Sequence, residues 1–122
     1  MRESNLWFWH ILSGVIILVL LGVHMAIMHM GASLSAIGFG SREPVAAAAV
    51  FQRSKQLVFM TTYILLLGSA LFHGLYGLRS MLFELDLSRT LEKAIGWVCA
   101  LAGVCLFAYG SYAAIYVFTM RG

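Results

Sequence analysis

Three long apolar stretches dominate this 122-residue chain and leave few folds open to it. They cover residues 6–30, 57–83 and 94–120, and each exceeds the roughly 20 helical residues that cross a hydrocarbon core of about 30 Å. Hydrophobic residues make up 61% of the chain and charged residues 11%, with a mean hydropathy of +0.90, whereas a soluble domain carries about 25% charged residues. We therefore predict an all-α integral membrane protein, a three-helix bundle in which residues 1–122 form one domain.

The connections between these spans differ in character. The first contains Ser41-Arg-Glu-Pro44 followed by a run of alanines, and proline in a first helical turn followed by alanine favours a short helix, which we expect at the membrane interface. The second connection, 84–93, is short and offers Ser88 as an N-cap, so the second and third spans are predicted to be antiparallel neighbours. The start of the chain lacks the basic region of a signal peptide, so the first span is expected to be retained.

Charge and cysteine content exclude several functions. The eight lysines and arginines are dispersed along the chain and form no basic patch, so nucleic-acid binding is not predicted. They divide equally between the two sides of the membrane, so the positive-inside rule gives no orientation. Cys99 and Cys105 lie about 240° apart on one helix, which argues against a disulfide or a metal pair and predicts two buried, unreactive thiols.

Two histidines, His24 and His73, lie inside the first and second spans. An ionisable side chain inside a membrane predicts a functional site, and the natural partner of a neutral imidazole there is haem iron. At about 1.5 Å per residue, His24 lies about 9 Å from one membrane face and His73 about 24 Å from the same face. This difference of roughly 15 Å prevents both from binding one iron, because two axial nitrogens lie only about 4 Å apart. If both are ligands, they serve two haems.

The neighbours of these histidines refine the prediction. Ser69, Ala70 and Gly77 share a helix face with His73, and small side chains there admit either a flat ring or another helix. His29 lies about 140° around the helix from His24, so we interpret it as an interfacial group near a haem propionate. His10 lies beside two tryptophans, close to the membrane surface opposite that of His29. We interpret it either as an interfacial side chain or as a quinone contact. Without haem, His24 and His73 would be polar groups hydrogen-bonded between helices.

The segment Leu71-Phe-His73-Gly-Leu-Tyr76-Gly77-Leu-Arg79 resembles a known motif. The cytochrome b anchor subunits of succinate dehydrogenase and fumarate reductase carry such a haem-ligand motif in the second helix, with glycine four residues after the histidine, arginine six after it and an acid eleven after it, here Glu84. The first span, with His10-Ile-Leu-Ser13-Gly14 and Val23-His24, resembles the first helix of the dihaem members. The resemblance ends near Leu85, and the third span carries no motif.

The resemblance implies a haem-b-binding membrane anchor that passes electrons between an iron–sulfur subunit and membrane quinone, while a flavoprotein subunit acts on succinate. This chain would itself be non-catalytic. His73 would ligate the haem nearer the iron–sulfur subunit and His24 the haem nearer the far surface, with His29 and Arg79 as propionate contacts. The family's orientation implies a bacterial cytoplasmic membrane with the N-terminus and the Arg79–Glu84 end on the cytoplasmic side.

This chain also departs from the family pattern. Dihaem anchors often carry five helices and four histidines, so one or two haems here would take their remaining ligands from a second anchor subunit, or from a second copy of the chain. The serine and arginine that hold quinone in single-haem anchors are replaced by Trp7 and Ile11.

Quinone candidates are therefore chosen by position near one surface. They are His10, Ser13, Arg79 and Glu84, of which Arg79 and Glu84 could instead only pair at the interface. The alternative functions are a b-type cytochrome subunit of another quinone-linked dehydrogenase and a haem-free structural or assembly protein.

Overall fold

The computed structural model describes residues 3–38, 43 and 45–120, and within them it contains helices and no strand. The helices are α1 (Glu3–His29), α2 (Gly31–Ala36), α3 (Ala47–Ser54), α4 (Leu57–Phe83) and α5 (Arg89–Thr119). Three of them, α1, α4 and α5, are long and apolar enough to cross a membrane. The predicted all-α class and its three membrane spans are confirmed.

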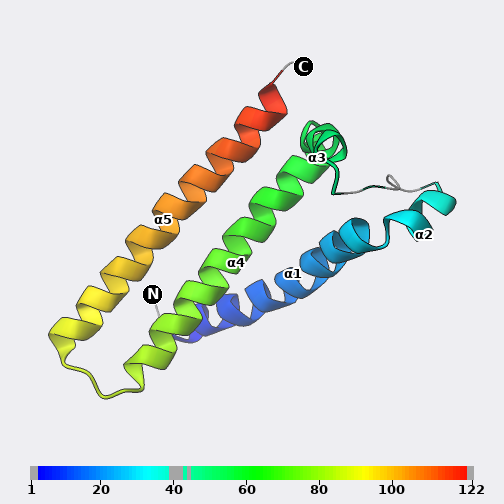
Figure 1. The fold of residues 1–122 in the computed structure, drawn as a ribbon. Helices are drawn as coiled ribbons and strands as arrows, with labels where there is room; N and C mark the ends of the chain where they lie inside the picture. The colour runs from blue at the N-terminus through cyan, green and yellow to red at the C-terminus, as the bar shows by residue number, and fades with distance from the viewer. Residues whose placement is uncertain (1–2, 39–42, 44, 121–122) are drawn as a thin grey trace.

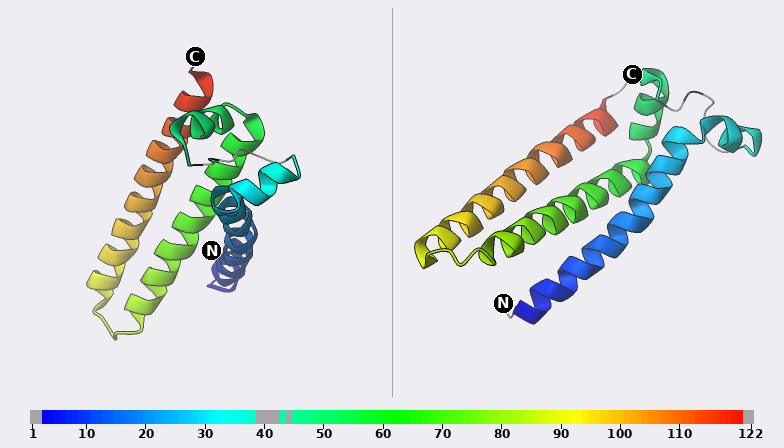
Figure 2. Two further views of the ribbon diagram at one scale, coloured as in Figure 1. Left: turned by 45° about the vertical axis from the view of Figure 1, so that its right-hand side comes forward. Right: turned by 60° about the horizontal axis from the view of Figure 1, so that its bottom comes forward.

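Helix α4 lies between the other two long helices (Figure 1). It contacts both α1 and α5, whereas α1 and α5 make no close backbone contact with each other within the described ranges. Successive long helices run in opposite directions, so the start of α1 and the α4–α5 turn share one end of the molecule, while α2, α3 and the end of α5 share the other (Figure 2). Because each outer helix has one neighbour, α1 and α5 leave broad faces uncovered.

Small and polar side chains, rather than large apolar ones, occupy the interior. No large apolar residue is buried in the described part of the chain, whereas Ser13, Arg53 and Ser69 are 6%, 7% and 8% exposed. Membrane helices pack through small residues because lipid covers their apolar faces as well as a protein core would. Cys99 is half-buried and Cys105 is exposed, where burial of both was predicted. Among the described helices α5 contacts only α4 and α3, so much of its surface is uncovered. Both cysteines are free, as predicted.

Glycines set the close packing of α4 against α5. Gly96, Gly103 and Gly110 recur every seventh residue along α5, which places them on one face. A Cβ atom added at Gly103 would lie 3.0 Å from Leu75 Cδ1 of α4, closer than the 3.5–4.0 Å optimum for two carbon atoms. The third span therefore carries a packing motif that the sequence analysis did not identify.

The turn between α4 and α5 uses two local devices. The Ser88 side chain accepts a hydrogen bond from the Leu91 backbone N–H at 3.3 Å, so the predicted N-cap is confirmed. Asp86 adopts a left-handed backbone conformation with φ 52°, which aspartate tolerates better than most residues. Together they reverse the chain within a short segment and hold α5 antiparallel to α4.

The connection between α1 and α4 contains two short helices where the sequence predicted one. The alanine stretch forms α3, which contacts α4 and α5 at one end of the molecule (Figure 1). Arg53 of α3 donates to the Met28 sulfur of α1 at 3.4 Å, which ties the connection to the first span. Pro44, expected in the first turn, lies outside the described residues, and the interfacial position of this helix stays a prediction.

Candidate functional site at the histidines of α1 and α4

His73 points from α4 toward α1, where its ring stacks on that of His10. The ring centroids are 4.2 Å apart and the planes differ by 5°. Both side chains are half-buried. The sequence placed His10 near the membrane surface but gave no indication of this pairing, because the register between two apolar helices depends on packing that a single sequence does not reveal.

Two oxygen atoms of α1 hold the Nδ1 atom of His73. The His10 backbone carbonyl lies 3.0 Å away and the Ser13 hydroxyl 3.3 Å away. The Ser13 hydroxyl donates its own proton to the same carbonyl at 2.7 Å. Both oxygens are therefore placed to accept from an Nδ1–H of His73, and in that tautomer the Nε2 atom keeps an unprotonated lone pair.

Two glycines allow α1 and α4 to approach at this level. A Cβ atom at Gly14 would lie 3.0 Å from His73 Cε1, and one at Gly77 would lie 3.2 Å from His10 Cε1. Of the small residues predicted to flank His73, Gly77 thus admits the His10 ring of a neighbouring helix, Ser69 is buried, and Ala70 is exposed. At Gly77 the small-residue face serves a helix contact.

Of the two stacked histidines, only one can bind a given metal ion. The lone pairs of imidazole nitrogens lie in the plane of the ring, so two parallel stacked rings cannot direct them at one ion between the rings. The Nδ1 atom of His10 is buried and has no hydrogen-bond partner among the described residues. An axial partner for His73 would therefore have to come from a residue other than His10.

His24 marks a second level of the same helix pair. It is half-buried and meets the Tyr63 ring of α4 edge-on, with centroids 5.9 Å apart and planes at 80°. Tyr63 precedes His73 by ten residues, about 15 Å of helix, which agrees with the difference in depth expected from the sequence. His29 is exposed at the end of α1.

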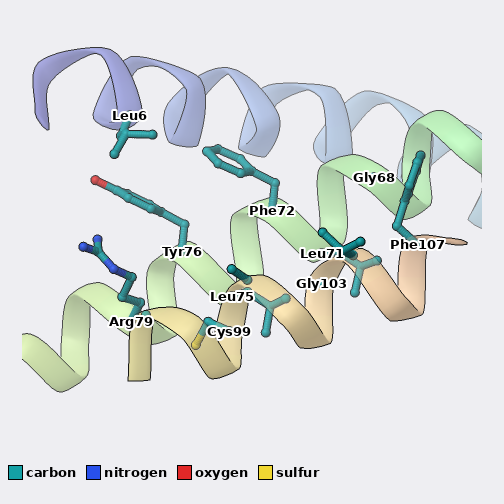
Figure 3. A pocket seen from close by; sticks show the side chains of 13 residues that line it. Leu6, Gly68, Leu71, Phe72, Leu75, Tyr76, Arg79, Cys99, Gly103 and Phe107 are labelled. Carbon is teal, nitrogen blue, oxygen red and sulfur yellow. The ribbon is translucent and has the colours of Figure 1, made fainter. Parts of the chain in front are cut away.

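Three grooves lie along α4, and none of the three is lined by a histidine. The first, of about 760 Å³ between α1 and α4, includes Trp9, Ser13 and Ser69. The second, of about 580 Å³ between α4 and α5, is apolar except for Tyr76 and Arg79, which extend in the same direction at one end (Figure 3). The third, of about 700 Å³, lies beside the α4–α5 turn.

The four quinone candidates lie at different places along the helices. His10 and Ser13 lie together at the α1–α4 contact, Arg79 lines the second and third grooves, and Glu84 is exposed at the end of α4 and lines none of the three.

Tyr76 is a site residue that sequence reasoning missed. Its ring lies 5.2 Å from that of His10 and stacks on Phe72 at 5.6 Å, and the Arg79 guanidinium carbon lies 6.0 Å from it. It thus joins the histidine pair to the groove between α4 and α5. Its position three residues after His73, nearly one helical turn, is the signal that could have identified it.

Metal-binding side chains are not clustered. Within the described residues, no group of three or more histidine, cysteine, aspartate or glutamate side chains could surround a metal ion. Haem needs only one axial side chain from a given helix, so a single histidine such as His73, in the tautomer that leaves Nε2 unprotonated, could serve as such a ligand.

Three long apolar helices with broad uncovered faces define a polytopic integral membrane protein. Over residues 2–110 the chain matches the family of the succinate dehydrogenase/fumarate reductase transmembrane subunit, and it belongs to that family. No curated protein and no solved structure matches it. The resemblance noted in the sequence is confirmed, and it extends through most of α5 rather than ending near Leu85. The chain is thus a membrane anchor subunit.

Proposed function

We propose that this anchor binds haem b and passes electrons between the iron–sulfur subunit of a succinate:quinone oxidoreductase and membrane quinone. The observation that carries the proposal is the position of His73 Nδ1, 3.0 Å from the His10 carbonyl. Metal-ligating histidines almost always donate the other ring N–H to a carbonyl, carboxylate or water, which fixes the tautomer and the ring orientation. His73 is thus arranged to present Nε2 to iron.

The two histidine levels support two haem positions in the complex. His73 serves the level near the start of α1, and His24 serves the level near its end. Haem b, when bound, supplies one-electron chemistry whose potential depends on its axial ligands and burial. Because each level in this chain offers one ligand, the opposite ligands come from a second membrane anchor subunit.

His29 and Arg79 are the candidate propionate contacts. His29 follows His24 by five residues, about 7 Å of helix, and Arg79 follows His73 by six, about 9 Å. Each lies toward the end of the molecule nearer its own histidine level. A haem at either level could therefore direct its propionates outward to a nearby cation or hydrogen-bond donor.

We place the quinone in the groove between α1 and α4, which Ser13 lines together with Trp9. Its walls are almost entirely apolar, which suits an isoprenoid quinone, and the Trp9 indole N–H is a donor for a quinone oxygen. As the family's orientation implies, the N-terminus and the α4–α5 turn face the bacterial cytoplasm. The iron–sulfur and flavoprotein subunits dock at this end of the molecule.

One observation favours a second candidate, a haem-free structural anchor. His73 is already hydrogen-bonded to α1 and stacked on His10, and such a contact stabilises a helix pair in lipid without any cofactor. The family membership is the same in both cases. What separates them is whether His73 Nε2 binds iron.

The deciding experiment is a dithionite-reduced minus oxidised spectrum with haem quantitation on the purified intact complex. His73→Ala and His24→Ala are compared with wild type, and Leu18→Ala, an exposed residue of α1, is the control. We expect each histidine substitution to remove or shift a different haem signal while the control changes neither. A complex with no haem, or one whose haem spectrum is unchanged by both substitutions, would refute the electron-transfer role and favour the structural one.

A further inference from the structure

The groove beside the α4–α5 turn gathers positive charge. Arg79, Arg89 and Lys93 line it against a single carboxylate, that of Glu92. Within the part of the chain that the structure describes, none of the three cations forms an ion pair. The groove therefore offers three cationic side chains to an anionic group supplied from outside the chain.

Aromatic and small residues shape this groove. The Arg79 guanidinium carbon lies 4.3 Å from the centroid of the Phe83 ring, a distance at which a cation–π contact is favourable. A Cβ atom at Gly96 would lie 3.7 Å from Arg79 Nε, so the arginine reaches across to α5. Trp97 is 70% exposed beside it, as is typical of tryptophan at a membrane boundary.

The cationic groove continues into an apolar one. Arg79, Gly96 and Ala100 line both this groove and the groove between α4 and α5. Figure 3 shows Arg79 at one end of the latter. The second groove extends to Gly68, eleven residues before Arg79 on α4, which corresponds to about 16 Å of helix. Its remaining lining, Tyr76 apart, is apolar. The two grooves together match a molecule with an anionic head and a long apolar chain.

We infer that this composite groove binds an acidic phospholipid, with its phosphate at Arg89 and Lys93, beside Arg79, and one acyl chain between α4 and α5. A quinone has a neutral head and would leave the three cations without counter-charge. A soluble protein would cover the cations but could not fill an apolar groove that runs into the membrane. Basic pockets between membrane helices are suited to acidic headgroups. The inference does not rest on haem binding.

The test uses the intact complex in nanodiscs of phosphatidylcholine alone or with phosphatidylglycerol as one fifth of the lipid. Retained lipid is measured by native mass spectrometry and the thermal unfolding midpoint is recorded. Arg89→Gln and Lys93→Gln are compared with Lys55→Gln, which removes the same charge from an exposed position near the other end of the molecule. Since each cation near an anionic surface contributes about 1 kcal/mol, we expect about fivefold weaker phosphatidylglycerol retention for each groove variant.

Wild type and Lys55→Gln should gain stability from phosphatidylglycerol, and the groove variants should lose most of that gain. Equal retention in Lys93→Gln and Lys55→Gln would overturn the inference, as would equal stabilisation by phosphatidylcholine alone. If the groove variants instead release the soluble subunits in both lipid mixtures, the cations dock protein and the lipid site is refuted. Haem content in the same samples reports separately on the proposed function.

Discussion

Replacing Gly14 with alanine tests how tightly α1 and α4 enclose the His73 ring. The added Cβ atom would lie 3.0 Å from His73 Cε1 and 3.3 Å from Nδ1. Carbon atoms pack best at about 3.5–4.0 Å, so the ring or the helix has to move by about 0.5 Å. The ring is also held by its stacking on His10 and by the His10 carbonyl, so the movement disturbs both contacts.

Gly22→Ala is the matched control. Gly22 lies on the same helix, and a Cβ atom there would meet nothing within 4 Å. Alanine gains about 1 kcal/mol over glycine in a helix interior, so the control is expected to be neutral or stabilising. Forcing extra volume into a packed contact costs about 1–3 kcal/mol. Gly14→Ala should therefore be less stable than Gly22→Ala by about 1–3 kcal/mol.

The assay is thermal unfolding of the purified complex together with its reduced-minus-oxidised spectrum. We expect a lower midpoint for Gly14→Ala and an altered signal from the haem proposed for His73, because changes next to a metal-ligating histidine typically weaken metal binding about 10- to 100-fold. Adding His10→Ala, which removes the stacked ring, should restore part of the loss. If Gly14→Ala and Gly22→Ala behave alike in both measurements, the α1–α4 contact described here is refuted.

Two smaller predictions concern the cap of α5 and the second histidine level. Ser88→Ala removes the N-cap and should destabilise the chain by about 0.5–2 kcal/mol, measured by thermal unfolding. Ser88→Asp retains a capping oxygen and should match wild type, so equal losses in both variants would contradict the capping role. Tyr63→Leu removes the edge contact with His24 and should shift only the haem signal that His24→Ala affects. A shift confined to the other signal would show that His24 and Tyr63 do not share a level.

Much of the architecture follows from the sequence because membrane physics acts on composition. Backbone N–H and C=O groups in lipid must be hydrogen-bonded within the spanning segment itself. Three long apolar stretches therefore form three helices, whatever each helix packs against. The cap at Ser88 is equally local, since a serine oxygen needs only the N–H groups of the next turn. The difference in depth between His24 and His73 follows from the fixed rise of a helix and from the opposite directions of successive membrane spans.

The contacts between helices were decided only in the tertiary structure. Apolar side chains all round each span leave the rotation and register of a helix undetermined in a single sequence, because lipid and protein contacts are nearly equivalent for them. The stacking of His10 on His73, the role of Ser13 and the place of Tyr76 therefore depend on how α1 meets α4. The grooves along α4 and α5 likewise depend on glycines that let the two helices approach. Which side chain each glycine admits is known only from the structure. The sequence by itself determined the helices, their depths and the family motif, and packing decided which side chains meet to form the site.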